Sequence, residues 1–267
     1  MRGPAAFCGI VGLKPSHAMI PVYPPSPMGD LEHIGLFARS VADLRPALDA
    51  LGGRDRNDPA SWPFRTPLDR PVADPQSLNF AASVDLNYGD PAAALRDRFA
   101  EVVSKLRHAG FRIDDIEVPI SPDFETCYEL FVPDAAATLA LAPPQRHELV
   151  DPEIRALAGR SDQMTVREYA AVEAVRDDTR RSFARLFEQV DCLLTLTQET
   201  LPNRLDETPG IMKLTRCFNV TGQPAISIPC GASRSGLSIG LQLVCDVGAD
   251  SLLLGITEAV AGVLDEI

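Results

Sequence analysis

The sequence predicts an α/β fold with a mixed β-sheet flanked by helices, and three observations support this. Helical and extended segments alternate along most of the chain. Residues 78–118 read as strand, amphipathic helix and strand, a unit that places two parallel strands side by side through a right-handed crossover. Residues 225–244 read as an antiparallel hairpin around the turn 231–236. A sheet that contains both kinds of pairing is mixed.

The first predicted helix covers residues 40–51. Ser40 is a residue type that caps helices, and Gly52 follows the end. Pro46 lies inside this range, and because proline lacks a backbone donor it predicts a kink or a later start. The polar, proline-rich stretch 57–75 is expected to be a surface connection.

The remaining elements follow from caps, periodicity and apolar runs. Pro91 opens an amphipathic helix that ends before Gly110. Thr165, with Glu168 three residues later, forms a capping box at the start of the longest helix. In chain order the expected elements are a strand over 78–84, a helix over 91–109, a strand over 111–118, a helix from 165 to about 190, a strand over 192–196, a helix over 212–220, the hairpin strands 225–228 and 237–244, and a helix from about 250 to 264.

Charge excludes some classes of partner. The 267 residues include 25 Lys+Arg and 37 Asp+Glu, a formal net charge of −12. Because nucleic acids and anionic membranes attract clustered positive charge, we expect neither as a partner. There is no secretory signal and no run of about 20 apolar residues, which predicts a cytoplasmic protein.

The helix that starts at Thr165 carries arginines interspersed with acidic residues. This alternation predicts a solvated, salt-bridged face rather than a binding patch. The arginines are Arg176, Arg180, Arg181 and Arg185, and the acidic residues are Glu173, Asp177, Asp178 and Glu188.

Cysteine spacing and motif content predict neither a metal site nor a cofactor. No C-x-x-C pair occurs, no histidine lies at zinc-finger spacing, and the phosphate-binding, dinucleotide-binding, H-E-x-x-H and G-x-S-x-G patterns are absent. We expect the cysteines to be reduced, buried small hydrophobic residues. They are Cys8, Cys127, Cys192, Cys217, Cys230 and Cys245.

Residues 2–16 carry the most specific motif of the chain. They read RGPAAFCGIVGLKPS and match every fixed position of R-x-P-A-x-x-C-G-x-x-G-L-K-P-[ST], the second half of the amidase signature. Further blocks at 34–43, 191–197, 218–231 and 240–244 resemble other segments of that family. The chain is therefore identified as resembling the amidase signature family, over its whole length but over only the C-terminal three-fifths of a typical member.

The resemblance implies a single amidase domain, of which residues 1–267 would be the C-terminal portion, with the N-terminal part of the mixed sheet missing. Members hydrolyse carboxamide C–N bonds with a Ser–cis-Ser–Lys triad. The nucleophilic serine corresponds to the position before Met1, and the other two residues lie further upstream. We therefore expect no catalytic residue in this chain and no activity of the chain alone.

The resemblance also assigns supporting positions within the motif. The family's arginine at the position of Arg2 is expected to pair with an acidic residue of the preceding loop, whereas in this chain we expect a solvated terminal arginine. Lys14 matches a structural lysine, not the catalytic one. The signature-motif support residues are Arg2, Pro4, Cys8, Gly9, Gly12 and Lys14.

Departures from the family pattern bear on substrate and partners. Residues 17–21 replace a Tyr-Gly-Arg-Val-Ser run typical of the tRNA-amidotransferase branch, which favours a generic amidase for aryl or acyl amides. The expected partner of the full-length form is a small-molecule amide. An alternative is a non-catalytic remnant that serves as an interaction or regulatory subunit. Because strands of both halves share one sheet in the family, an exposed strand edge predicts self-association of this chain.

Overall fold

The structure is a computed structural model that describes residues 1–24, 29–61, 74–204, 206 and 213–265. A mixed sheet of seven strands forms its centre, in the order β2-β1-β6-β7-β5-β3-β4. The strands β3, β4 and β5 are parallel to one another, and the other pairings are antiparallel. The strands are β1 (Val11–Lys14), β2 (Leu36–Ala38), β3 (Asn79–Ala82), β4 (Arg112–Asp115), β5 (Cys192–Leu196), β6 (Ala225–Ala232) and β7 (Ser238–Val244). The predicted α/β class with a mixed sheet is confirmed.

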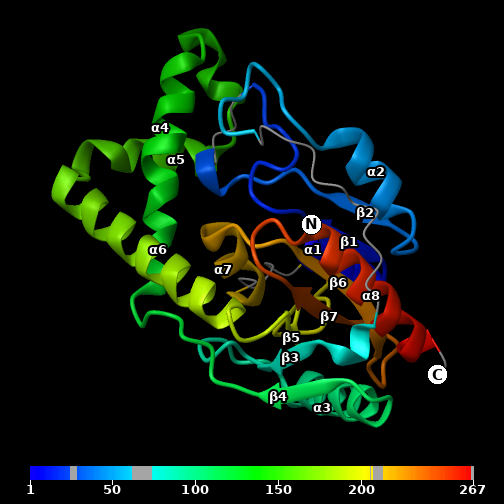
Figure 1. Ribbon diagram of the computed structural model, residues 1–267. Helices are drawn as coiled ribbons and strands as arrows, with labels where there is room; N and C mark the ends of the chain where they lie inside the picture. Colours follow the sequence, from blue (N-terminus) through cyan, green and yellow to red (C-terminus); the bar gives the residue numbers. More distant parts are fainter. Residues whose placement is uncertain (25–28, 62–73, 205, 207–212, 266–267) are drawn as a thin grey trace.

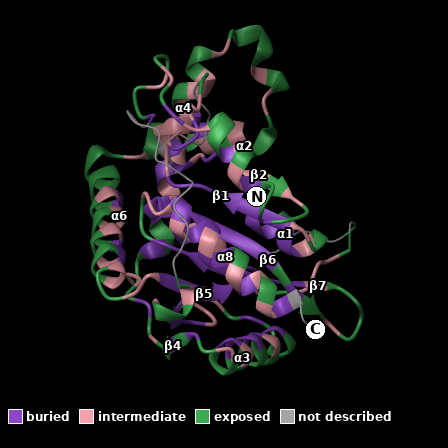
Figure 2. Cartoon of the chain, turned by 45° about the vertical axis from the view of Figure 1, so that its right-hand side comes forward, coloured by how far each residue is buried: buried purple, intermediate pink, exposed green. Residues whose placement is uncertain are grey.

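Helices surround this sheet. In Figure 1, α4 and α5 stand at the upper left, at the opposite end of the molecule from β4 and α3. In Figure 2, α8 crosses the sheet, whose strands are mostly buried, while the outer face of α6 is exposed. The helices are α1 (Arg2–Cys8), α2 (Leu44–Leu51), α3 (Ala93–His108), α4 (Phe131–Leu141), α5 (Pro152–Gly159), α6 (Val166–Phe187), α7 (Lys213–Thr221) and α8 (Asp250–Asp265). Among the described residues, none of these helices combines the length and the apolar character that crossing a bilayer requires.

Most predicted elements are present, and the exceptions have local causes. The strand β5 has the predicted bounds, and β6 and β7 form the predicted hairpin. The helix α2 begins only at Leu44, so Pro46 lies in the first turn, where a backbone donor has no helical partner. Ser40 therefore does not cap it, and its hydroxyl donates to Asp43 at 2.7 Å instead. The predicted connection 57–75 lies largely outside the described residues, which exclude 62–73.

Three regions were not predicted. The motif segment 2–16 folds into α1 and β1, Leu36–Ala38 form the edge strand β2, and residues 124–163 form α4 and α5 between short 3₁₀ turns. Periodicity is a weak guide in the third region, because Leu141 and Leu149 are each 82% exposed and break any apolar stripe.

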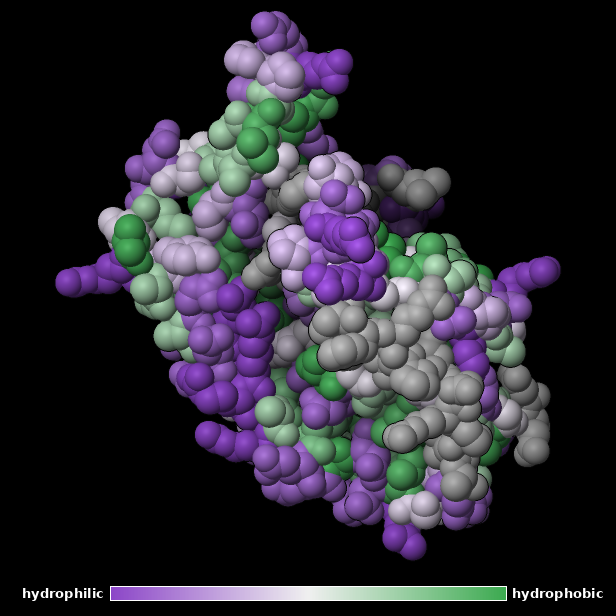
Figure 3. All heavy atoms as spheres, turned by 45° about the horizontal axis from the view of Figure 1, so that its top comes forward, coloured by the Kyte–Doolittle hydropathy of each residue, from purple (hydrophilic) through white to green (hydrophobic). Residues whose placement is uncertain are grey.

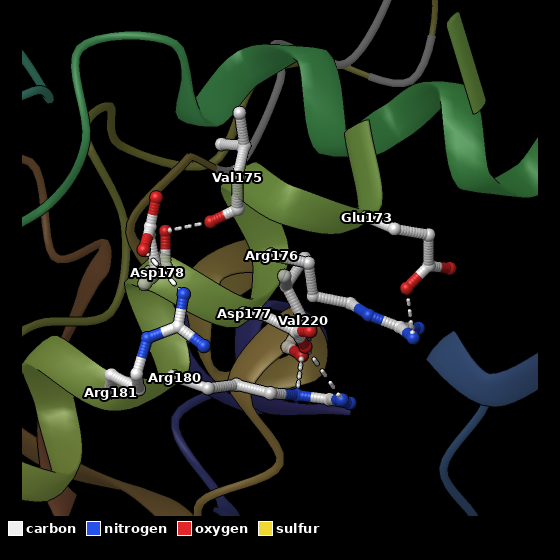
Figure 4. A network of polar contacts seen from close by, with 9 residues as sticks. Glu173, Val175, Arg176, Asp177, Asp178, Arg180, Arg181 and Val220 are labelled. Atoms are coloured by element: carbon white, nitrogen blue, oxygen red, sulfur yellow. Dashed lines mark hydrogen bonds and ion pairs between the residues drawn. The ribbon is translucent and has the colours of Figure 1, made fainter. Parts of the chain in front are cut away.

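The salt-bridged face of α6 is confirmed. Figure 4 shows Arg176 paired with Glu173, Arg180 with Asp177 and Arg181 with Asp178, each three residues apart. The pairs of Arg180 and Arg181 are exposed and add only about 0.3–0.5 kcal/mol each, whereas the Arg176–Glu173 pair is partly buried.

Arg180 also connects two helices. Its Nε donates to the carbonyl oxygen of Val220 at 3.1 Å and so ties α6 to the end of α7. The capping box of Thr165 and Glu168 is present as predicted at the start of α6.

The helix α1 lies unusually close to the sheet because small residues face each other across the contact. A Cβ atom added to Gly12 of β1 would stand 2.5 Å from Cβ of Ala5, and one on Gly240 of β7 would stand 2.5 Å from Cβ of Ala6. Both alanines are fully buried. Glycine at these two strand positions thus sets the distance between α1 and the sheet.

We expect Gly12→Ala to lower the free energy of unfolding by about 1–3 kcal/mol, because the new methyl group overpacks the contact with Ala5. The measurement is urea unfolding followed by circular dichroism. Gly262→Ala in α8 is the matched control, since no atom lies within 4 Å of its added Cβ, and it should be neutral or stabilising by up to about 1 kcal/mol. An unchanged urea midpoint for Gly12→Ala would contradict the close contact.

Candidate active site

The motif residues build one corner of the molecule. Gly9 ends α1 in the left-handed conformation (φ 66°), and its N–H donates to the carbonyl of Ala5. This reverses the chain into β1, which ends at Lys14. Pro4 in the first turn of α1 and Cys8 in the last are four residues apart, so both lie on the exposed face of the helix.

Cys8 is therefore not buried, which corrects the expectation for that cysteine; the other five are buried as predicted. The side chain of Cys8 lies opposite the helix face that Ala5 and Ala6 bury against the sheet. No cluster of metal-ligating side chains occurs in the part of the chain that the structure describes.

Arg2 is buried, so the expectation of a solvated terminal arginine is wrong. Its side chain is 3% exposed and has polar partners on two other elements. Nη1 donates to Oε1 of Gln242 at 2.7 Å, and Nη2 donates to the carbonyl oxygen of Thr215 and to Oδ1 of Asn219, both at 2.6 Å. The guanidinium also lies 5.7 Å from the centre of the Phe218 ring. Burial lowers the pKa of Arg2 to about 10, so it stays charged at neutral pH.

The partners of Arg2 are held in place by further bonds. Nε2 of Gln242 donates to the carbonyl of Leu214 at 3.0 Å, and Nδ2 of Asn219 donates to the carbonyl of Leu31 at 3.1 Å. The network joins α1, β7, α7 and the turn before β2. Sequence patterns did not single out Asn219 and Gln242 as site residues, although both lie inside blocks that resemble the family.

Lys14 is buried next to a second polar cluster. It is 1% exposed, and its Nζ donates to the carbonyl of Pro15 at 3.0 Å. Burial lowers the pKa of Lys14 well below its ordinary value, and the charge of Arg2 lowers it further.

Asp250, the first residue of α8, accepts bonds from the backbone N–H and the hydroxyl of Ser16 at 2.9 and 2.5 Å. Burial raises the pKa of this carboxyl in spite of those bonds. The end of the motif is thus tied to α8.

A hollow of about 620 Å³ opens where α1, α7 and the α4–α5 region meet. This volume suits a small organic ligand. Arg2, Gly3, Pro4 and Lys14 line it from the motif, while Gly9, Gly12 and Cys8 do not. The structure therefore brings together three of the six predicted support positions, Arg2, Pro4 and Lys14, at the wall of the hollow.

The other walls come from residues outside the motif. The Arg216 guanidinium on α7 stacks over the Tyr128 ring, 4.1 Å from its centre. Arg160 forms an ion pair with Glu129. The remaining residues that line the hollow are Met1, Leu31, Phe131, Leu157, Thr215, Asn219 and Val220.

Comparison with known proteins shows the family to which the chain belongs. Residues 1–254 match the Amidase family, so the match includes the whole of the motif and every residue that lines the hollow. The chain belongs to the amidase signature family. The amidase fold extends to solved structures: a bacterial aryl acylamidase has a TM-score of 0.84 at 18% identity, covering 98% of this chain and 60% of that one.

Curated relatives differ in their described activities. A glutamyl-tRNA(Gln) amidotransferase subunit of Synechococcus sp. (strain RCC307) is 28% identical over 292 residues, covering 95% of this amidase chain and 60% of that protein. The 2-amino-5-chloromuconic acid deaminase of Comamonas testosteroni is also 28% identical, covering 100% and 59%. The 6-aminohexanoate cyclic dimer hydrolase, solved with its substrate, has a TM-score of 0.81 at 26% identity and covers 98% and 62%. The chain thus spans about three-fifths of the length of these relatives.

We expect Arg2→Met to lower the free energy of unfolding by about 3 kcal/mol or more. The change leaves Gln242, Asn219 and the carbonyl of Thr215 buried without their donor, and each unsatisfied group costs about 1–3 kcal/mol. Thermal melts and urea unfolding test this. Arg234→Met, at an exposed turn position, is the control and should change stability by less than about 0.5 kcal/mol. Equal stabilities of the two variants would refute the structural role of Arg2.

Lys14→Met should stabilise the protein at neutral pH, and the gain should shrink as the pH rises. At pH values between the lowered pKa of folded Lys14 and its ordinary value of 10.5, Lys14 holds fewer protons in the folded state than in the unfolded state. Unfolding at such a pH therefore takes up a proton. The contribution of Lys14 to stability therefore rises with pH across this window. Comparing urea unfolding of both proteins from pH 7 to 10 tests this, and a constant difference would contradict it.

Proposed function

We propose that this chain is the C-terminal portion of an amidase domain whose full-length form hydrolyses a carboxamide C–N bond of a small molecule. The observation that carries the proposal is the position of the signature segment: α1 begins at the wall of a ligand-sized hollow, and Arg2 fixes it against α7 and β7. In the family pattern the nucleophilic serine stands directly before the residue at Met1. Its hydroxyl would then reach a substrate in this hollow.

We propose further that the chain alone is inactive. The residues matched to the family's nucleophile, cis-serine and lysine all precede the position of Met1. Lys14 is a poor substitute base, because its Nζ is buried against the carbonyl of Pro15. The alternative, a non-catalytic interaction or regulatory subunit derived from an amidase, predicts the same inactivity. The DNA upstream of Met1 distinguishes the two.

The test has two parts. The upstream DNA is read in all frames for a segment that ends in Gly-Gly-Ser and carries Ser-Ser-Gly and a lysine further upstream. The chain with and without that in-frame segment is then assayed for ammonia or amine release from a panel of aryl and acyl amides. We expect hydrolysis only with the segment, abolished by a serine-directed phosphonate. Reproducible, phosphonate-sensitive turnover by the chain alone would refute the proposal, and an absent or frameshifted segment would favour the regulatory alternative.

We propose that the isolated chain associates with a second copy through the edge at β2. The chain exposes 13823 Å², against about 11,000 Å² expected for a folded monomer of this mass. Phe37 in β2 is 52% exposed and lines a hollow with Leu36 and Leu44, at which Arg39 and Asp43 also lie. The opposite edge, β4, carries exposed charged residues, which discourage pairing. The face of the molecule seen in Figure 3 differs from the β2 edge, because its hydrophobic residues occur in small groups between hydrophilic ones.

Sedimentation at 0.15 M salt should therefore show dimers or larger species that bind a hydrophobic dye. Phe37→Asp should shift the distribution toward monomer, because a charge on the edge strand opposes pairing. Leu141→Asp is the control, since Leu141 is 82% exposed at the end of α4. A sharp monomer boundary for the unmodified chain, with a cooperative melt, would show that it is stable by itself.

A further inference from the structure

We propose that Arg216 is a substrate-specificity residue, which binds a carboxylate that the amide substrate carries at the end of an apolar spacer. The inference rests on the proposed amidase function and names its substrate class. It starts from the basic side chains that line the hollow: Arg2, Lys14, Arg160 and Arg216.

Three of these basic side chains already have structural partners. The guanidinium of Arg2 has four polar and aromatic neighbours on α7 and β7. The Nζ of Lys14 donates to the carbonyl of Pro15. Arg160 pairs with Glu129, which also neutralises the carboxylate that lines the hollow. Among the described residues, Arg216 has no carboxylate within ion-pair distance, and it is only half-buried.

The Tyr128 ring holds the Arg216 side chain in place, with the guanidinium carbon 4.1 Å from the ring centre. A guanidinium carries five N–H donors in one plane. A planar carboxylate meets two such N–H groups in a bidentate pair. Arg216 covers one face of the Tyr128 ring, and the Phe131 ring stacks on Tyr128 with its centre 6.1 Å away, so the ring is a poor site for a cationic ligand. The hollow therefore favours an anionic group over a cationic one.

The backbone that carries Arg216 is fixed from both sides. Arg2 holds the carbonyl of the preceding residue, Thr215, and the side chain of Asn219, and Arg180 holds the carbonyl of Val220. The same network that positions α1 thus fixes the distance between Arg216 and the start of α1.

Apolar side chains line the same hollow. Leu31, Phe131 and Leu157 belong to its wall. A methylene spacer between the amide and the carboxylate would contact them, whereas a second charge there would be desolvated without a partner. The matching ligand class is the monoamide of an aliphatic dicarboxylic acid.

The test is calorimetric binding to this chain, which needs no turnover and so is independent of the proposed catalysis. The probes are the monoamide of adipic acid and adipamide, which have the same length and differ in one carboxylate. We expect the monoamide to bind roughly 10- to 100-fold more tightly, the range for hydrogen bonds to a charged group. Arg216→Gln should remove this preference, and Arg216→Lys should retain part of it. Arg234→Gln is the control.

Folding of each variant is checked by its thermal melt. A second variant, Tyr128→Leu, leaves Arg216 in place but removes the ring that it contacts. We expect Tyr128→Leu to weaken the preference for the monoamide. Equal affinities of the unmodified chain for the two probes, no binding of the monoamide, or an unchanged preference in Arg216→Gln would overturn the inference. If the monoamide is preferred but no amide is hydrolysed by the extended protein, the proposed reaction fails while this binding site stands.

Discussion

The buried guanidinium of Arg2 is the interaction on which this corner of the molecule depends. A fully desolvated charge is tolerated only when its donors are satisfied, and here the acceptors are neutral oxygens of Gln242, Asn219 and Thr215. No carboxylate takes part in those three bonds. The acceptors can reach the guanidinium only if α1, β7 and α7 meet at one point. The motif therefore constrains elements more than 200 residues away.

The small residues of the motif make that meeting possible. Ala5 and Ala6 let α1 approach Gly12 and Gly240 closely, and this brings Arg2 within reach of β7. At the other end of the motif, Ser16 binds Asp250 and ties β1 to α8. The motif thus works first as a structural connector, and only four of its residues, Arg2, Gly3, Pro4 and Lys14, line the hollow.

The sequence predicted what depends on neighbouring residues and missed what depends on distant ones. The capping box at Thr165, the hairpin and the strand–helix–strand unit all arise from local patterns, and all are present. The burial of Arg2 was missed because its partners lie 213–240 positions along the chain. The helices α4 and α5 were missed because exposed leucines such as Leu141 obscure their periodicity. Tertiary contacts, not local propensity, determine both the burial of Arg2 and the formation of α4 and α5.

The residues inside the motif and those outside it that line the hollow differ in how they bear on substrate choice. A tRNA-dependent amidotransferase component and a deaminase are each 28% identical to this chain, although their names describe different reactions. The motif fixes α1, β1 and α7, and these form a frame that different chemistries can share. Tyr128, Phe131, Leu157 and Arg216 line the hollow from outside the motif. They can change in size or charge without breaking a bond to Arg2, so under the proposed function selection among amides would fall to these positions.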